Sequence, residues 1–282
     1  MISGMTSKEP YLPFLAPAII LIGGLFLIPV GQLVILSFDG FVEPSLQFYR
    51  QIIATDSIHR IILTTLRITA LTSIIAVVLA YIVAYALAHM GPRQRMLLFL
   101  CVLVPFWLSV LVRALSWLIL LRNNGLVNSA LLETGLIGSP LPLVRNETGV
   151  VIGMVHYLVP YAVFPIYAAM QSLDGRVFMA ARSVGGRPLR VFLDVYLPLT
   201  VPSVLGAGLL VFVFGLGFFI TPAILGGGRV VMLSEYVSIS VLQTVRWGLA
   251  AALSVVLLAT TLALIALVRR FAGVGKMLGA SP

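Results

Sequence analysis

The chain has 282 residues, of which 60% are hydrophobic and 10% charged, and its mean hydropathy is +1.12. Soluble domains carry about 25% charged residues, so this composition excludes a soluble fold of this length. The formal net charge is +9, but the basic residues are spread between apolar runs. That distribution indicates membrane orientation and argues against a nucleic-acid-binding face.

Six apolar segments are long enough to cross a bilayer, which takes about 20 residues of helix. We predict an all-α integral membrane protein, a single transmembrane domain over residues 1–282, with spans near 12–36, 61–88, 96–121, 150–170, 200–225 and 249–268. The first run is too long for the apolar part of a signal peptide, so we expect an uncleaved span. The one cysteine, Cys101, lies in the third run and predicts a buried packing thiol, with neither a disulfide nor a metal cluster.

Loop charge predicts the orientation. With both termini in the cytoplasm, the inner loops carry ten Lys and Arg residues and the outer loops carry six. The outer six are Arg50, Arg60, Arg122, Arg145, Arg229 and Arg246. The positive-inside rule therefore places residues 174–198, between the fourth and fifth spans, in the cytoplasm.

Two arginines and one histidine fall inside the predicted spans. A buried arginine is costly in lipid, so Arg113 is either a pathway or gate residue or a structural arginine bonded to helix-end carbonyls. Arg67 lies nearer the outer end of its span and is expected to extend to the interface. His156 has no acid near it in the sequence, so we expect hydrogen-bonded packing and no proton relay.

Residues 174–198 combine arginines with a break at Gly185-Gly186. "GRVFMAARSV" has apolar residues at helical spacing, and glycine suits the left-handed geometry that ends a helix. Pro188 suits the first turn of a second short helix, "LRVFLDVYLP", which runs to Pro198. Two interpretations stay open: a loop whose arginines bind anionic lipid headgroups, and a rigid pair of short helices that docks on a partner.

A spaced pattern of small residues in this segment favours docking. It reads Ala180-Ala181, three residues, Gly185, nine residues, Val195, one residue, Leu197-Pro198. The pattern resembles the EAA loop, "E-A-A-x3-G-x9-I-x-L-P", of permease subunits in binding-protein-dependent ABC importers. Met179 stands where that family has Glu, which weakens one expected polar contact with the ATPase. The resemblance implies that the loop couples to an ATPase subunit through Met179, Ala180, Ala181, Gly185, Gly186, Arg187, Leu197 and Pro198.

The resemblance extends from about residue 60 to 270. "PFWLSVLVRALSWLILL" and "GFFITPAILGGG" look like the permeases of the spermidine/putrescine importer group. This implies the type I ABC importer permease fold, with six transmembrane helices and a cytoplasmic coupling helix between spans four and five, in the bacterial cytoplasmic (inner) membrane. The implied partners are a second permease in a heterodimer, two copies of a cytoplasmic ATP-binding subunit, and a periplasmic or lipid-tethered solute-binding protein. ATP and Mg²⁺ would lie on the ATPase, and no cofactor is expected in this chain.

The solute stays open on the sequence. Where the group often reads L-G-x-F-x-T-P with an acidic x, this chain has Phe218, and the six predicted spans contain no Asp or Glu. A pathway for polycations favours carboxylates or aromatic faces. The candidate pathway residues are Trp107, Arg113, Trp117, Phe218 and Phe219. A polyamine, an amino-acid derivative, an opine or a phosphonate all remain candidate solutes, and carboxylates could come from the partner permease.

Competing functions find less support in the residues. A secondary transporter driven by an ion gradient is the main alternative, but it needs a mid-membrane ion site and internal repeats, and neither is visible. An intramembrane enzyme lacks H-E-x-x-H, G-x-S-x-G and paired intramembrane carboxylates. A structural scaffold gives no reason for the spaced small residues. The absence of G-x-x-x-x-G-K-[ST] places any ATP dependence on another subunit, so we predict a non-catalytic permease.

Overall fold

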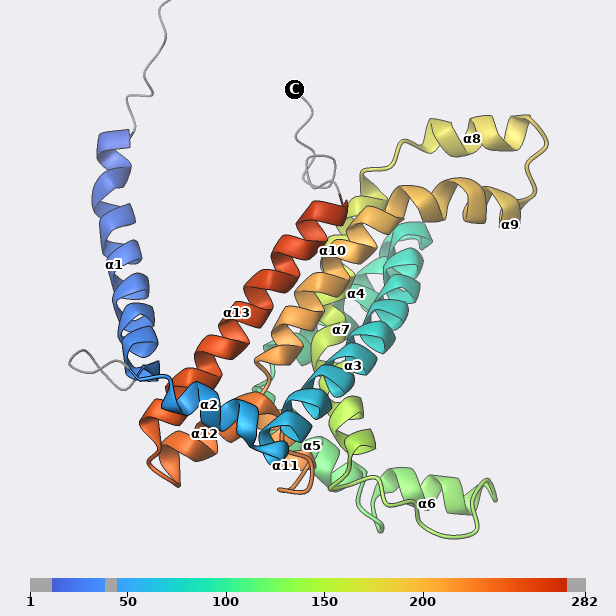
Figure 1. Ribbon diagram of the computed structural model, residues 1–282. Helices are drawn as coiled ribbons and strands as arrows, with labels where there is room; N and C mark the ends of the chain where they lie inside the picture. The colour runs from blue at the N-terminus through green and yellow to red at the C-terminus, as the bar shows by residue number, and fades with distance from the viewer. Residues whose placement is uncertain (1–11, 39–44, 273–282) are drawn as a thin grey trace, which may run out of the picture.

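The computed structural model describes residues 12–38 and 45–272, and every regular element within these two ranges is helical (Figure 1). The helices are α1 (Leu12–Ser37), α2 (Gln47–Ala54), α3 (Asp56–His89), α4 (Pro92–Trp107), α5 (Val110–Leu120), α6 (Leu126–Glu133), α7 (Glu147–Gln171), α8 (Gly175–Ser183), α9 (Pro188–Val191), the π-helix η1 (Phe192–Tyr196), α10 (Leu197–Leu216), α11 (Ile220–Leu225), α12 (Leu233–Leu242) and α13 (Trp247–Ala272). The predicted all-α class is confirmed.

Five of the helical stretches are long and apolar enough to cross a membrane. They are α1, α3, α7, α13 and the stretch Pro188–Leu216, which joins α9, η1 and α10. The bent pair α4 and α5 makes a sixth candidate if both helices belong to one span. The six predicted apolar segments thus correspond to five or six candidate spans.

The segment 96–121, predicted as one span, is sharply bent. α4 ends at Trp107, α5 begins at Val110, and the two axes meet at 102°. Pro105 lies in the last turn of α4, where its ring removes a helical hydrogen-bond donor. Leu108 and Ser109 then adopt extended backbone angles, so the chain changes direction over two residues.

Two further boundaries differ from the prediction. The segment 200–225 is interrupted after Leu216, and the short helix α11 follows from Ile220. The stretch "LRVFLDVYLP" is no separate helix, because α9 continues through η1 into α10. The wider turn of a π-helix occurs mostly inside longer α-helices and is frequent at functional sites.

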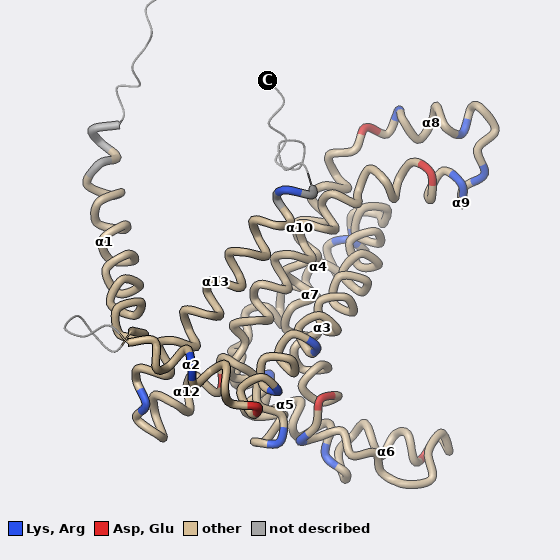
Figure 2. The backbone as a smooth tube through the Cα atoms, viewed as in Figure 1, with Lys and Arg blue, Asp and Glu red and all other residues tan. Residues whose placement is uncertain are grey.

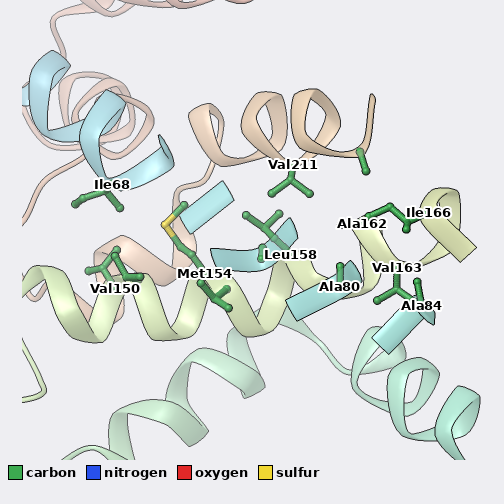
Figure 3. Packing of buried hydrophobic residues seen from close by; sticks show 14 of the residues in the cluster. Ile68, Ala80, Ala84, Val150, Met154, Leu158, Ala162, Val163, Ile166 and Val211 are labelled. Atoms are coloured by element: carbon green, nitrogen blue, oxygen red, sulfur yellow. The ribbon is translucent and has the colours of Figure 1, made fainter. Parts of the chain in front are cut away.

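The core lies between α3, α7 and α10 (Figure 3). Ala76, Ala80 and Ala84 recur every four residues on α3 and are fully buried, which lets α7 approach closely. Leu158 and Met154 fill the facing side of α7, and both are 0% exposed. Cys101 was predicted to be buried with this core, but it lies exposed on α4.

Peripheral helices complete the arrangement. α13 packs against α1 and α12, and α1 leans away from the bundle toward its N-terminal end (Figure 1). α8 and α9 lie together at one end of the bundle, here called the elbow end. α2, α6, α11 and α12 lie at the opposite end, here called the α6 end.

Candidate functional site

The turn between α8 and α9 is fixed by its backbone. Gly185 adopts a φ of +86°, in the left-handed region that disfavours any residue with a Cβ. Its N–H donates to the Arg182 carbonyl at 3.0 Å, and the Gly186 N–H donates to the Ala181 carbonyl at 3.1 Å. A Cβ on Gly186 would lie 2.5 Å from the Ala181 oxygen. Both glycines are therefore required for this closed turn.

The start of α8 is also capped. The Asp174 carboxylate accepts a hydrogen bond from the Arg176 N–H at 2.9 Å, which satisfies one of the free donors of the first turn. With this cap at one end and the glycine turn at the other, α8 is a short helix of defined length. We call residues 174–198 the elbow. Figure 2 shows basic segments along α8 and along α9, its two arms.

An aromatic cluster joins the elbow to the bundle. The Tyr196 ring of η1 lies 5.3 Å from Phe178 of α8 and 5.4 Å from Tyr85 at the end of α3. Phe192 and His89 also lie within 6 Å of Tyr196, with centroid distances of 5.8 and 5.5 Å. These rings connect α8 to the end of α3 and, through η1, to the start of α10.

The residues predicted for ATPase coupling fall into two groups. Met179, which is 65% exposed, belongs with Ala180, Ala181, Gly185, Gly186 and Arg187 on α8 and its glycine turn. Leu197 and Pro198 lie at the start of α10, on the far side of the π-helix. Beside the turn is a cavity of about 260 Å³, lined in part by Met179, Arg182 and Pro188. The spaced motif thus extends from α8 and the glycine turn to the start of α10.

A second cluster surrounds Arg113 in the bundle. Arg113 is only 7% exposed, and its guanidinium carbon lies 4.2 Å from the centre of the Tyr157 ring. Its Nε and Nη1 atoms have no hydrogen-bond partner among the residues described. Tyr157 in turn contacts Phe218 at 4.7 Å and shares a hydroxyl hydrogen bond with Tyr161 at 3.3 Å. A buried cation is thus held mainly by aromatic faces.

The structure brings together only part of the predicted pathway set. Arg113 and Phe218 meet across Tyr157, and Trp117 lies near them with its ring 5.6 Å from His156. Trp107 is 80% exposed at the end of α4, and Phe219 is 39% exposed, so neither joins the cluster within this chain.

Sequence reasoning missed Tyr157 and Tyr161. Both tyrosines lie four residues apart on α7, so they share one face of the helix. That spacing was the available signal. His156 packs against Trp117, as predicted of a packed side chain, and its Nδ1 has no hydrogen-bond partner in the described part of the chain.

Two acidic residues, Glu147 and Glu235, lie at the α6 end, outside the middle of the bundle. Glu147 begins α7 and forms an ion pair with Arg67, whose side chain is exposed. Glu235 on α12 is 5% exposed, and burial raises the pKa of its carboxyl above the usual value, while a hydrogen bond from the Met232 backbone opposes the rise. Its Oε2 atom has no partner in the described ranges.

Comparison with known proteins gives a family match. Residues 76–273 match the family described as "Binding-protein-dependent transport system inner membrane component". The chain is also 30% identical over 196 residues to the spermidine/putrescine transport system permease protein PotB of Haemophilus influenzae, covering 70% of this chain and 68% of that protein. PotB of Escherichia coli (strain K12) is 30% identical over 197 residues, with 70% and 72% covered.

A solved structure supports the fold independently of close sequence similarity. A chain of the bacterial alginate ABC transporter, solved in complex with an alginate pentasaccharide-bound periplasmic protein, is 17% identical and has a TM-score of 0.71. The similarity covers 95% of this chain and 94% of that one. At this identity the likeness concerns the arrangement of the helices alone.

Proposed function

Because this chain belongs to the binding-protein-dependent inner membrane components of ABC importers, as a non-catalytic permease, we propose that it forms the translocation pathway together with a second, different permease. Two copies of a cytoplasmic ATP-binding subunit would dock beneath the pair. A periplasmic or lipid-tethered binding protein would deliver the solute. Both termini and residues 174–198 would then lie in the cytoplasm, in agreement with the excess of basic residues in those loops.

The observation that carries this proposal is the elbow. α8 is exposed, capped at both ends and held on a closed glycine turn, which suits a helix that seats in a groove of a partner. The aromatic cluster around Tyr196 connects it to α3 and to α10. Closure of the ATPase pair on ATP binding would push on α8, and these contacts would carry the movement into the spans. The pathway would thereby switch between inward- and outward-facing forms.

The solute belongs to the small polar compounds, either polyamine-like or of the amino-acid and opine type. Similarity to the two PotB proteins supports a polyamine. The aromatic faces of Tyr157 and Phe218 suit a cation, whereas the Arg113 guanidinium repels one. A polyamine pathway would therefore draw its carboxylates from the partner permease. Uptake of labelled spermidine, in competition with an opine, distinguishes the two solute classes.

Co-purification tests the function. The tagged chain is extracted from its native membranes as wild type, as Gly185→Trp and as Gly175→Trp, and the proteins that accompany it are identified. Both glycines are exposed with no atom within 4 Å of an added Cβ, but only Gly185 has a positive φ. We expect a P-loop ATPase and a second permease with wild type, and loss of the ATPase alone in Gly185→Trp.

Two outcomes would contradict the proposal. Retention of the ATPase by Gly185→Trp, at the wild-type ratio, would remove the elbow from the docking surface. Recovery of the wild-type chain alone, with uptake driven by an ion gradient, would favour a secondary transporter. Retention of the second permease by Gly185→Trp shows that the variant has folded.

A further inference from the structure

A basic cavity of about 940 Å³ opens at the α6 end, opposite the elbow. Arg122, Asn123 and Asn124 line it from the loop after α5, Arg145 from the loop before α7, and Arg229 from the turn after α11. All three arginines are exposed. Figure 2 shows basic segments gathered in this region, between α11 and the start of α6.

The loop that carries Arg122 is held in one conformation. Asn128 is fully buried, and its amide donates to the Arg122 carbonyl at 3.1 Å and to the Leu141 carbonyl at 3.0 Å. Its Oδ1 atom accepts from the Leu141 N–H at 2.8 Å. One buried side chain thus binds the two arms of the loop together, so Arg122 is presented from a preorganised backbone.

Arg145 and Arg229 lie on two segments that contact each other. Arg145 has a φ of +60°, which is uncommon for a residue with a side chain, and its N–H donates to the Leu225 carbonyl at 2.8 Å. The stem of Arg145 crosses Gly227, where an added Cβ would lie 2.8 Å from the arginine Cγ. Arg229 follows two residues later and donates its N–H to the Gly226 carbonyl at 3.1 Å. Backbone strain of this kind is retained where the surroundings determine the conformation, often at functional positions.

The three guanidinium groups lack acidic partners. The ion pair found in the described ranges joins Arg67 to Glu147, and no carboxylate there lies within 4.0 Å of Arg122, Arg145 or Arg229. Three like charges on one rigid cavity repel one another, and a complementary anionic surface relieves that repulsion. The guanidinium fork binds carboxylates through two parallel hydrogen bonds, which adds geometric selectivity.

We propose that this cavity is the docking site for an acidic patch, built from Asp and Glu side chains, on the solute-binding protein. The assignment rests on the proposed function, which places the α6 end outside the membrane and requires a binding protein there. The cavity is open, its arginines lie on loops beyond the ends of the candidate spans, and hydrogen bonds hold the backbone that carries them. These features suit a protein surface that docks from outside the membrane.

The test uses the whole importer, with partner permease, ATPase and binding protein, in nanodiscs of phosphatidylcholine. ATP hydrolysis is measured against binding-protein concentration for wild type and for the triple variant Arg122→Gln, Arg145→Asn, Arg229→Gln. Asn is used at Arg145 because it tolerates the left-handed region. We expect the half-saturating concentration to rise about tenfold with an unchanged maximal rate, since each exposed ion pair contributes modestly.

Two controls separate a specific surface from general charge. Arg50→Gln with Arg246→Gln removes exposed arginines of the same predicted outer side but outside the cavity, and should change the half-saturating concentration less than about twofold. Arg122→Lys with Arg229→Lys keeps the charge but not the fork, and should fall between wild type and the triple variant. Raising the salt concentration should weaken stimulation of the wild type more than that of the triple variant.

Several results would overturn the assignment. One is an unchanged half-saturating concentration in the triple variant, and another is an equal loss in the Arg50 and Arg246 control. A shift confined to nanodiscs containing phosphatidylglycerol would assign the cavity to lipid headgroups, and lost uptake with normal stimulation would assign it to an anionic solute. Failure of any binding protein to stimulate the wild type is a separate result, which would remove the proposed function and this site with it.

Discussion

Replacement of Gly185 by alanine isolates the geometry of the elbow turn. The added Cβ meets no atom within 4 Å, so the cost comes from the backbone φ of +86° alone. An L-residue in the left-handed region costs about 1–2 kcal/mol. That penalty shifts the balance from the closed turn to open forms by roughly 5- to 30-fold.

Gly175→Ala is the matched control, because it makes the same chemical change in open space at the first residue of α8. An alanine there has an ordinary helical backbone and stabilises the helix slightly, so Gly175→Ala should stabilise the elbow locally where Gly185→Ala destabilises it. Amide hydrogen exchange at residues 184–186 reports the opening of the turn. Solute transported per ATP hydrolysed, measured in proteoliposomes, reports coupling.

We expect faster exchange and a lower coupling ratio in Gly185→Ala, with wild-type values in Gly175→Ala. The thermal midpoint should stay near that of wild type in both variants, because neither glycine contributes to the core between α3, α7 and α10. Equal exchange rates in the two variants would refute the claim that the left-handed residue closes the turn. Faster exchange with an unchanged coupling ratio would refute the link between turn geometry and transport.

Three further predictions concern other parts of the chain. Leu158→Ala empties a position that is 0% exposed and should lower the free energy of unfolding by about 2–5 kcal/mol. Leu126→Ala, at a position 70% exposed, should change that free energy by less than about 0.5 kcal/mol. Thermal unfolding in detergent compares the two variants, and similar losses would contradict the assigned core. Tyr157→Leu removes the ring beneath the Arg113 guanidinium and should cost about 0.5–2 kcal/mol of unfolding free energy, more than Tyr157→Phe, which keeps the ring; equal losses would argue against a cation–π contact. Burial raises the pKa of Glu235 above 4.5, so the stability that its protonated form provides is complete below pH 4.5 and is lost as pH rises through the raised pKa. The thermal midpoint of Glu235→Gln should therefore fall less between about pH 4 and about pH 8 than that of wild type. Parallel profiles for the two proteins would contradict this.

Hydropathy predicted which helices are long and apolar enough to cross a membrane, but not where the chain bends. Length and apolar content suffice for α1, α3, α7 and α13, since about 20 apolar residues meet the requirement for a span. The 102° bend between α4 and α5 falls inside an equally apolar run, and Pro105 is its main sequence signal. Proline does not always break a helix in a membrane, because neighbouring groups can satisfy the freed carbonyl. The direction of the chain after Trp107 therefore depends on tertiary packing.

The candidate sites were predictable to different degrees. The elbow follows from local rules, because glycine, proline and helical spacing act over a few residues. The cluster around Arg113 depends on how α5 packs against α7. That packing brings together residues far apart in the chain, so short sequence patterns do not predict it. Tyr157 lies in an apolar run and looks like ordinary core. The π-helix η1 was also not predictable, since its residues suit an α-helix equally well.

α3 connects the two ends at which partners are proposed to bind. It has 34 residues, so at about 1.5 Å per residue it is about 51 Å long. At the elbow end, the ring of Tyr85 lies 5.4 Å from the ring of Tyr196. Near the other end, the Thr65 hydroxyl oxygen accepts a 2.8 Å hydrogen bond from the N–H of Leu233, the first residue of α12. The close alanine packing against α7 holds the helix between these points, so we infer that it moves as one body. A push on α8 would then reach α12 without any change inside the helix. This explains how an elbow at one end of the bundle could control access at the other.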